Sequence, residues 1–270
     1  MSAVRWSGML LGGLLAACAS GSLPPAAGEK RDVRTGAPES GLPWRLHLPD
    51  TATGEHPLRL LVWMHPSGGS ANALVEPLAP AFAERGWALL VVTDKDFSGW
   101  RGQEANRLML GTLPDVARLP GVDARQPVLL GFSAGAQMAL ELWAARPGAF
   151  GGLVLLAGAP RLSQGSEQLP PAGEARARVP LLAVVGAGDG SAPLWREASR
   201  TWPAAGLSLE VLEVLGRGHE WLLGDEAALA RVLEWLQARA AGWWRCEGPS
   251  RGPRNSQFTV RSEGCLGATS

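Results

Sequence analysis

The amino-acid sequence predicts an α/β protein with a mostly parallel central sheet and helices on both faces. From Leu42 onward, short apolar runs alternate with longer runs of helical period, which is typical of a parallel sheet covered by helices. Several short runs are continuously apolar, as strands buried on both faces are. The predicted strands are Trp44 to Leu48, Leu58 to His65, Trp87 to Thr93, Pro127 to Gly131, Leu153 to Ala157, Leu181 to Gly186 and Leu209 to Leu215. The predicted helices are Ala71 to Arg85, Glu104 to Leu119, Ala134 to Ala145, Ala192 to Trp202 and Asp225 to Ala241.

Length and charge restrict the function classes. A chain of 270 residues suits one large domain with additional terminal segments. A domain of this size buries enough surface to fold without metal ions or disulfides. The 25 basic and 25 acidic side chains balance, so no basic excess points to a nucleic-acid partner. The sequence has no Gly-rich phosphate loop and no spacing typical of metal ligands, so we expect no cofactor and no metal.

The first residues resemble an export signal. Arg5 supplies a positive start, and Gly8 to Ala17 is an apolar stretch that is too short to span a bilayer but fits a signal peptide. The sequence Leu15-Ala16-Ala17-Cys18 resembles the lipobox of bacterial lipoproteins, in which cleavage leaves the cysteine as a lipid-modified N-terminus. We therefore expect a signal peptide at residues 1–17 and a lipid-anchored Cys18. The alternative is a plain secreted protein.

The residues after Cys18 predict an extracytoplasmic location. Ala19 and Ser20 resemble the signal that sorts lipoproteins to the outer membrane. Residues 18–41 are rich in Gly, Ser, Pro and Ala without an apolar period, which predicts a flexible tether. Residues 242–270 form a tail, in which Cys246 and Cys265 could form a disulfide in an oxidising compartment. Two free thiols are the alternative.

A nucleophile motif lies in the middle of the chain. Gly131-Phe132-Ser133-Ala134-Gly135 matches G-x-S-x-G, in which glycines allow a sharp turn that exposes the serine between a strand and a helix. A predicted strand enters the turn and a predicted helix leaves it. An ordinary strand-to-helix turn with an incidental serine is the alternative reading.

A serine nucleophile needs a base, usually a histidine held by a carboxylate. Of the four histidines, His219 alone lies downstream of Ser133, and Asp189 is the sole aspartate between them. Asp189 follows a predicted strand, where this class of sheet places ligand chemistry. Glu210 and Glu213 are the rival acids, but both fall within a predicted strand.

The loop His65-Pro66-Ser67-Gly68-Gly69 follows another predicted strand. Its backbone N–H groups could bind the oxyanion of an acyl-transfer intermediate together with the N–H of Ala134. Because proline has no N–H, the second donor is either Ser67 or Gly68. A Gly-rich turn before a helix is the structural alternative.

The order Ser133, Asp189, His219, preceded by the His65 loop, resembles the α/β-hydrolase superfamily over about Leu42 to Ala241. The compact layout is similar to its dienelactone-hydrolase, polyhydroxybutyrate-depolymerase and feruloyl-esterase-like branches. Many relatives have His-Gly where this chain has His65-Pro66, a departure that bears on the second oxyanion donor. The resemblance implies a serine carboxylesterase that acts through an acyl-enzyme, with a small-molecule or polymer ester as substrate. The short connection from Ala157 to Val179 leaves no room for a large cap domain.

Aromatic residues near the expected site are candidates for substrate binding. Phe97 and Trp100 follow one predicted strand and Trp221 lies two residues after His219, so any of them could stack on a sugar or an aromatic acyl group. Packing within the loops is the alternative. Two other functions also stay open: a serine peptidase or amidase with the same triad, and a non-catalytic envelope binding protein.

Overall fold

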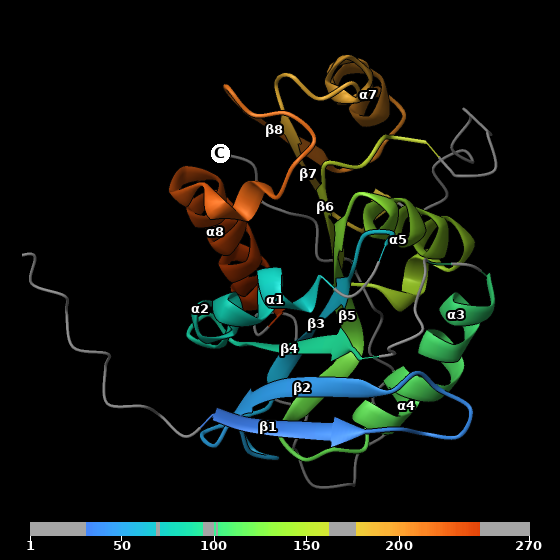
Figure 1. Ribbon diagram of the computed structural model, residues 1–270, viewed down its shortest axis with the longest axis vertical. Helices are drawn as coiled ribbons and strands as arrows, with labels where there is room; N and C mark the ends of the chain where they lie inside the picture. Colours follow the sequence, from blue (N-terminus) through green and yellow to red (C-terminus); the bar gives the residue numbers. More distant parts are fainter. Residues whose placement is uncertain (1–30, 69–70, 94–99, 101, 162–176, 244–270) are drawn as a thin grey trace, which may run out of the picture.

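The fold is a sheet between two layers of helices (Figure 1). The computed structural model describes residues 31–68, 71–93, 100, 102–161 and 177–243. Its eight-stranded sheet has the order β1-β2-β4-β3-β5-β6-β7-β8. The β1–β2 and β2–β4 pairs are antiparallel, and the remaining pairs are parallel. The strands are β1 (Arg31–Gly36), β2 (Trp44–Pro49), β3 (Leu58–Met64), β4 (Trp87–Val92), β5 (Val122–Phe132), β6 (Gly152–Leu156), β7 (Leu181–Gly186) and β8 (Leu209–Val214).

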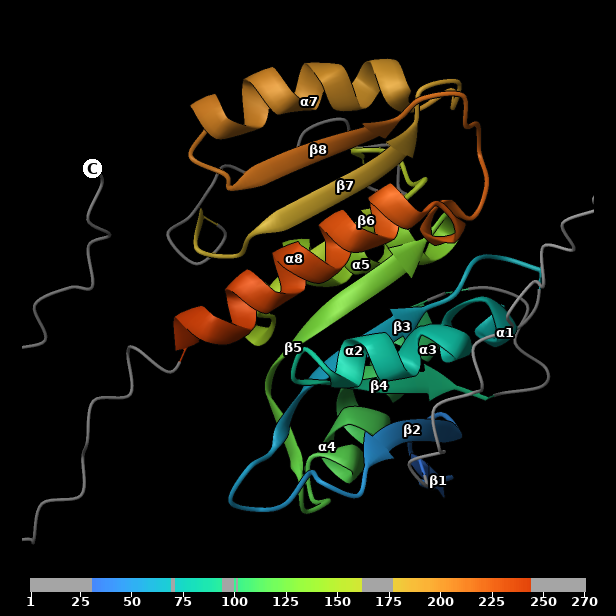
Figure 2. The ribbon, with the colours of Figure 1, turned by 90° about the vertical axis from the view of Figure 1, so that its left-hand side faces the viewer.

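The helices divide between the two faces of the sheet. Alternate residues of β3 point to opposite cores: Leu60 and Val62 contribute to one, and Leu61 and Trp63 to the other. The first core includes side chains of α3, α4, α5 and α7, and the second includes side chains of α1, α2 and α8. The ribbons of these two groups of helices lie on opposite faces of the sheet (Figures 1 and 2). The helices are α1 (Asn72–Val75), α2 (Ala79–Ala83), α3 (Gly102–Arg107), α4 (Leu113–Val116), α5 (Ala134–Ala145), α7 (Ala192–Ala204) and α8 (Glu226–Trp243). Burial on both faces explains why the strand sequences are continuously apolar, and the predicted fold class is confirmed.

Strand β1 corrects one prediction. We expected residues 18–41 to be a flexible tether, but Arg31–Gly36 forms a strand that pairs with β2 along its whole length. The side chains described in β1 are exposed or half-buried, so the strand carries no apolar run. Backbone hydrogen bonds to β2 hold it at the edge of the sheet.

Two predicted helices are interrupted. The segment predicted as one helix from residue 71 to 85 is α1, a 3₁₀ turn at Glu76–Leu78, and α2. Pro77 and Pro80 lack the N–H that a continuous helix needs. The segment predicted from residue 104 to 119 contains a π-helical turn at Leu108–Thr112 between α3 and α4.

The π-helical turn between α3 and α4 binds the segment that leads into β2. The fully buried Thr112 hydroxyl accepts a hydrogen bond from the Leu42 N–H at 2.7 Å and donates one to the Leu42 carbonyl oxygen at 3.0 Å. The Arg107 guanidinium also donates to the Gly41 carbonyl oxygen. These contacts fix the chain where it enters β2.

Several predicted features lie outside the described residues: Cys18, the tail with Cys246 and Cys265, Phe97, and most of the connection from Ala157 to Val179. Within the part of the chain that the structure describes, no helix has the length and apolar character needed to cross a membrane.

Candidate active site

The predicted triad residues lie at the carboxyl ends of neighbouring parallel strands. Ser133 directly follows β5, Asp189 follows β7 and His219 follows β8. Since β5, β6, β7 and β8 are consecutive in a parallel part of the sheet, these ends meet at one edge. This edge is where open α/β sheets bind ligands.

Ser133 stands in a strained turn. Its backbone has φ 52° and ψ −115°, a left-handed region that costs energy for a residue with a Cβ. A Cβ on Gly131 would lie 2.6 Å from the backbone N of Ala136, and one on Gly135 would overlap the Met64 carbonyl oxygen. Glycine is therefore required on both sides of Ser133, because α5 begins in direct contact with the backbone of β5 and β3.

Hydrogen bonds join the three side chains in a line. Ser133 Oγ lies 3.0 Å from His219 Nε2, and His219 Nδ1 lies 2.8 Å from Asp189 Oδ2. The Asp189 side chain is 4% exposed and that of His219 is 54% exposed. The structure thus brings the predicted nucleophile, base and acid together, with the acid buried and the base open to solvent.

Asp189 is held as an anion. Burial alone raises the pKa of its carboxyl, but hydrogen bonds from Ser191 and His219 outweigh burial, and the pKa falls below its ordinary value. The Ser191 N–H and hydroxyl both donate to Asp189 Oδ1, at 2.7 and 2.8 Å. Sequence reasoning missed Ser191, although a serine two residues after an aspartate is a known turn pattern.

The loop that carries His219 is attached to the turn that carries Asp189. The Gly188 N–H donates to the Arg217 carbonyl oxygen at 2.8 Å. A Cβ on Gly186 would overlap the carbonyl oxygen of Gly218, so the two segments touch through their backbones. This contact holds Asp189 and His219 close to each other.

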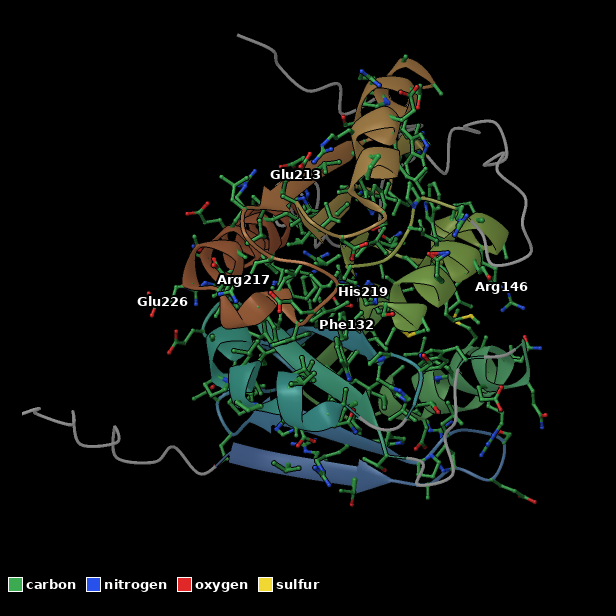
Figure 3. The ribbon with its side chains drawn as sticks, turned by 45° about the horizontal axis from the view of Figure 1, so that its top comes forward. Phe132, Arg146, Glu213, Arg217, His219 and Glu226 are labelled. Carbon is green, nitrogen blue, oxygen red and sulfur yellow. The ribbon has the colours of Figure 1, made fainter. Side chains whose placement is uncertain are left out.

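Phe132, the second residue of the motif, contacts the base. Its ring stacks on the imidazole of His219, with centroids 6.1 Å apart and planes at 25°, and both residues are labelled near the centre of Figure 3. The Phe132 ring also contacts Trp221, edge to face at 5.8 Å. Sequence reasoning treated this residue as a variable position of the motif.

The predicted oxyanion loop packs against the start of α5. His65 is 1% exposed, and burial lowers the pKa of its imidazole, which favours the neutral form. Its Nδ1–H donates to the Pro66 carbonyl oxygen at 3.0 Å. In a trans peptide the carbonyl and the following N–H point in opposite directions, so the Ser67 N–H is directed away from the buried imidazole.

The predicted substrate-binding tryptophans are both engaged in packing. The Trp100 indole N–H donates to the His65 carbonyl oxygen at 2.8 Å, and its ring lies 5.3 Å from the imidazole of His65. Trp221 is half-buried and contacts the ring of Trp63 at 5.5 Å. Their contact with substrate stays a prediction.

The rival acids lie elsewhere. Glu213 forms a bidentate ion pair with Arg196, at 2.8 and 2.7 Å. Glu210 pairs with Arg231 and Arg239. Among the described residues, no group of three or more His, Cys, Asp or Glu side chains is arranged to hold a metal ion.

Comparisons with known proteins agree on the fold. No protein-family model matches the chain, and no curated protein matches it. Among solved structures, a carboxylesterase from Mesorhizobium loti is 22% identical, with a TM-score of 0.57 over 76% of this chain and 98% of that one. An esterase from Rhizomucor miehei is 14% identical, with a TM-score of 0.59 over 79% and 84%. A putative dipeptidyl aminopeptidase IV from Bacteroides ovatus is 13% identical, with a TM-score of 0.57 over 77% of this chain but 36% of that one. The chain has the α/β-hydrolase fold.

Proposed function

We propose that this chain hydrolyses carboxylic esters through an acyl-enzyme intermediate on Ser133. The observation that carries the proposal is the hydrogen-bonded line from Ser133 Oγ to His219 Nε2 at 3.0 Å and from His219 Nδ1 to Asp189 Oδ2 at 2.8 Å. This line starts at a strained, half-buried turn. A hydroxyl in such a line is activated by the base beside it.

The chemistry follows from the protons in this line. The Asp189 carboxylate accepts a hydrogen bond from Nδ1–H, so Nε2 has a lone pair for the Ser133 proton. As that proton moves to Nε2, Oγ attacks the acyl carbonyl. The N–H of Ala134 and an N–H of Ser67 or Gly68 would bind the oxyanion. The imidazolium then protonates the departing alcohol, and a water molecule activated by His219 releases the acid.

Esters are favoured over amides by the similar structures. The Rhizomucor miehei and Mesorhizobium loti proteins are described as esterases, and this chain covers 84% and 98% of them. The peptidase is covered over 36% of its length, so most of that enzyme has no counterpart in the match. The preference for esters rests on this difference in coverage.

The function is tested by substrate profiling of the purified protein. We expect turnover of p-nitrophenyl esters, slower turnover of matching peptide p-nitroanilides, and covalent labelling of Ser133 by a fluorophosphonate probe. Faster cleavage of the anilides would favour a peptidase. Absence of both labelling and turnover would favour a non-catalytic binding protein.

We also propose that Cys18 carries the lipid that anchors the protein to a bacterial membrane. Each buried methylene of an acyl chain contributes about 0.8 kcal/mol, so two or more chains give stable attachment. The Cys18→Ala protein is expected to leave the membrane fraction, as measured by fractionation and immunoblotting. If the variant stays with the membranes as fully as the parent does, Cys18 is not the anchor.

A further inference from the structure

The imidazole of His219 needs support on its face. Its side chain is 54% exposed, and Gly218 precedes it in an irregular loop. The hydrogen bonds to Ser133 and Asp189 lie in the ring plane and fix two of its atoms. These two hydrogen bonds do not prevent the ring from rotating about the axis through Nδ1 and Nε2. A contact on the face of the ring can restrict that rotation.

We propose that Phe132 is a positioning residue that sets the ring plane of His219 and stabilises its imidazolium form during the reaction, an inference that rests on the proposed ester hydrolysis. The Phe132 ring stacks on the imidazole with planes at 25°. Phe132 is the last residue of β5 and precedes Ser133. The same backbone segment therefore positions both the nucleophile and the surface on which the base rests.

The aromatic rings behind Phe132 lead into the buried core. Trp221 contacts the Phe132 ring at 75° and 5.8 Å, and Trp63 contacts Trp221 at 88° and 5.5 Å. Trp63 is fully buried in the core between the sheet and α8. Edge-to-face contacts of this kind are favourable and directional, so the four rings link the base to the core.

The stack also acts on charge. When Nε2 takes the Ser133 proton, the imidazole becomes a cation whose centroid lies 6.1 Å from that of the Phe132 ring, at the outer limit of the distance over which an aromatic face attracts a cation. Asp189 faces the imidazole from the turn after β7. The loop that carries His219 also carries Arg217 and Glu220, which form an ion pair with each other at 3.5 Å. Phe132 adds a neutral surface that favours the charged imidazole without forming a hydrogen bond to it.

The test compares Phe132→Leu, which keeps apolar bulk but loses the ring, with Phe132→Tyr, which keeps the ring. We expect Phe132→Leu to lower kcat by about tenfold with KM changed less than twofold, and to move the acidic limb of the pH–rate profile to lower pH, because the imidazolium loses its aromatic partner. Phe132→Tyr should retain parental kcat and pH profile. Phe132→Met replaces the leucine variant if circular dichroism shows that the latter is unfolded.

Two results would overturn the role of Phe132: a folded leucine variant with parental kcat and pH profile, or a tyrosine variant that behaves like the leucine variant. A lowered kcat with an unmoved acidic limb would also contradict the charge effect. These outcomes differ from failure of the proposed function, in which hydrolysis by the parent does not depend on Ser133. The low-field proton resonance of His219 Nδ1–H gives a readout without substrate, and we expect it to broaden in Phe132→Leu alone.

Discussion

Ser133→Ala is expected to lower the rate of ester hydrolysis by about 10⁶-fold. The change removes the oxygen atom that bonds to the acyl group, and with it the hydroxyl from which His219 would take the proton. The comparison of kcat/KM for p-nitrophenyl acetate between parent and variant measures the effect. The variant should fold like the parent, because alanine keeps the Cβ of serine and the change removes only the hydroxyl and its exposed hydrogen bond to His219.

Ser199→Ala is the matched control for this change. Ser199 lies on α7, where its hydroxyl donates to the Arg196 carbonyl oxygen within the helix. The variant should hydrolyse the ester at the parental rate and melt at a similar temperature. A Ser133→Ala protein that keeps parental activity would exclude the covalent mechanism.

Asp189→Asn is expected to lower kcat by about 10⁴-fold, the size known for the corresponding change in the chymotrypsin triad. The contacts of Ser191 explain why. Its backbone N–H donates to Asp189 Oδ1, so the oxygen of an asparagine should take that position and its NH₂ should face His219. Nδ1 would then have to accept a hydrogen bond, which leaves the proton on Nε2 and removes the base.

The matched control removes the charge of a rival acid that lies outside the hydrogen-bonded line. Glu213→Gln loses the ion pair with Arg196 at the surface, and its kcat should stay within twofold of the parent. Stopped-flow or steady-state assays of both variants at pH 7 to 9 provide the measurement. Equal losses in the two variants, or parental activity in Asp189→Asn, would contradict the role of Asp189.

The sequence predicts the sheet well where strands are buried on both faces. In β4, all six residues are buried, so an apolar run marks the strand regardless of its neighbours. Strand β1 could not be found this way, because its described side chains are exposed or half-buried and it is held by pairing with β2. Likewise, the helical period from residue 71 to 85 does not reveal that Pro77 lies in a 3₁₀ turn that separates α1 from α2.

The site was predictable where chemistry and chain order restrict the choice. Ser133 lies in a glycine motif that backbone contact requires, and few histidines and aspartates follow it. Phe132 was not predictable, because its contact with His219 arises only when separate strand ends meet. Ser191 was missed although it contacts Asp189 within the same turn. The two tryptophans predicted to contact substrate have partners within the protein that the sequence did not indicate.

If Cys18 carries the proposed lipid, strand β1 limits how far the folded domain can stand from the membrane. Twelve residues, 19–30, separate this cysteine from the strand, and a chain of that length spans at most about 40 Å. A tether that continued to Gly41 would span about 80 Å. The shorter reach is close to the diameter of the domain itself, about 40 Å. An anchored domain would therefore stay within about one domain diameter of the bilayer surface. Esters further from the membrane would have to diffuse to it.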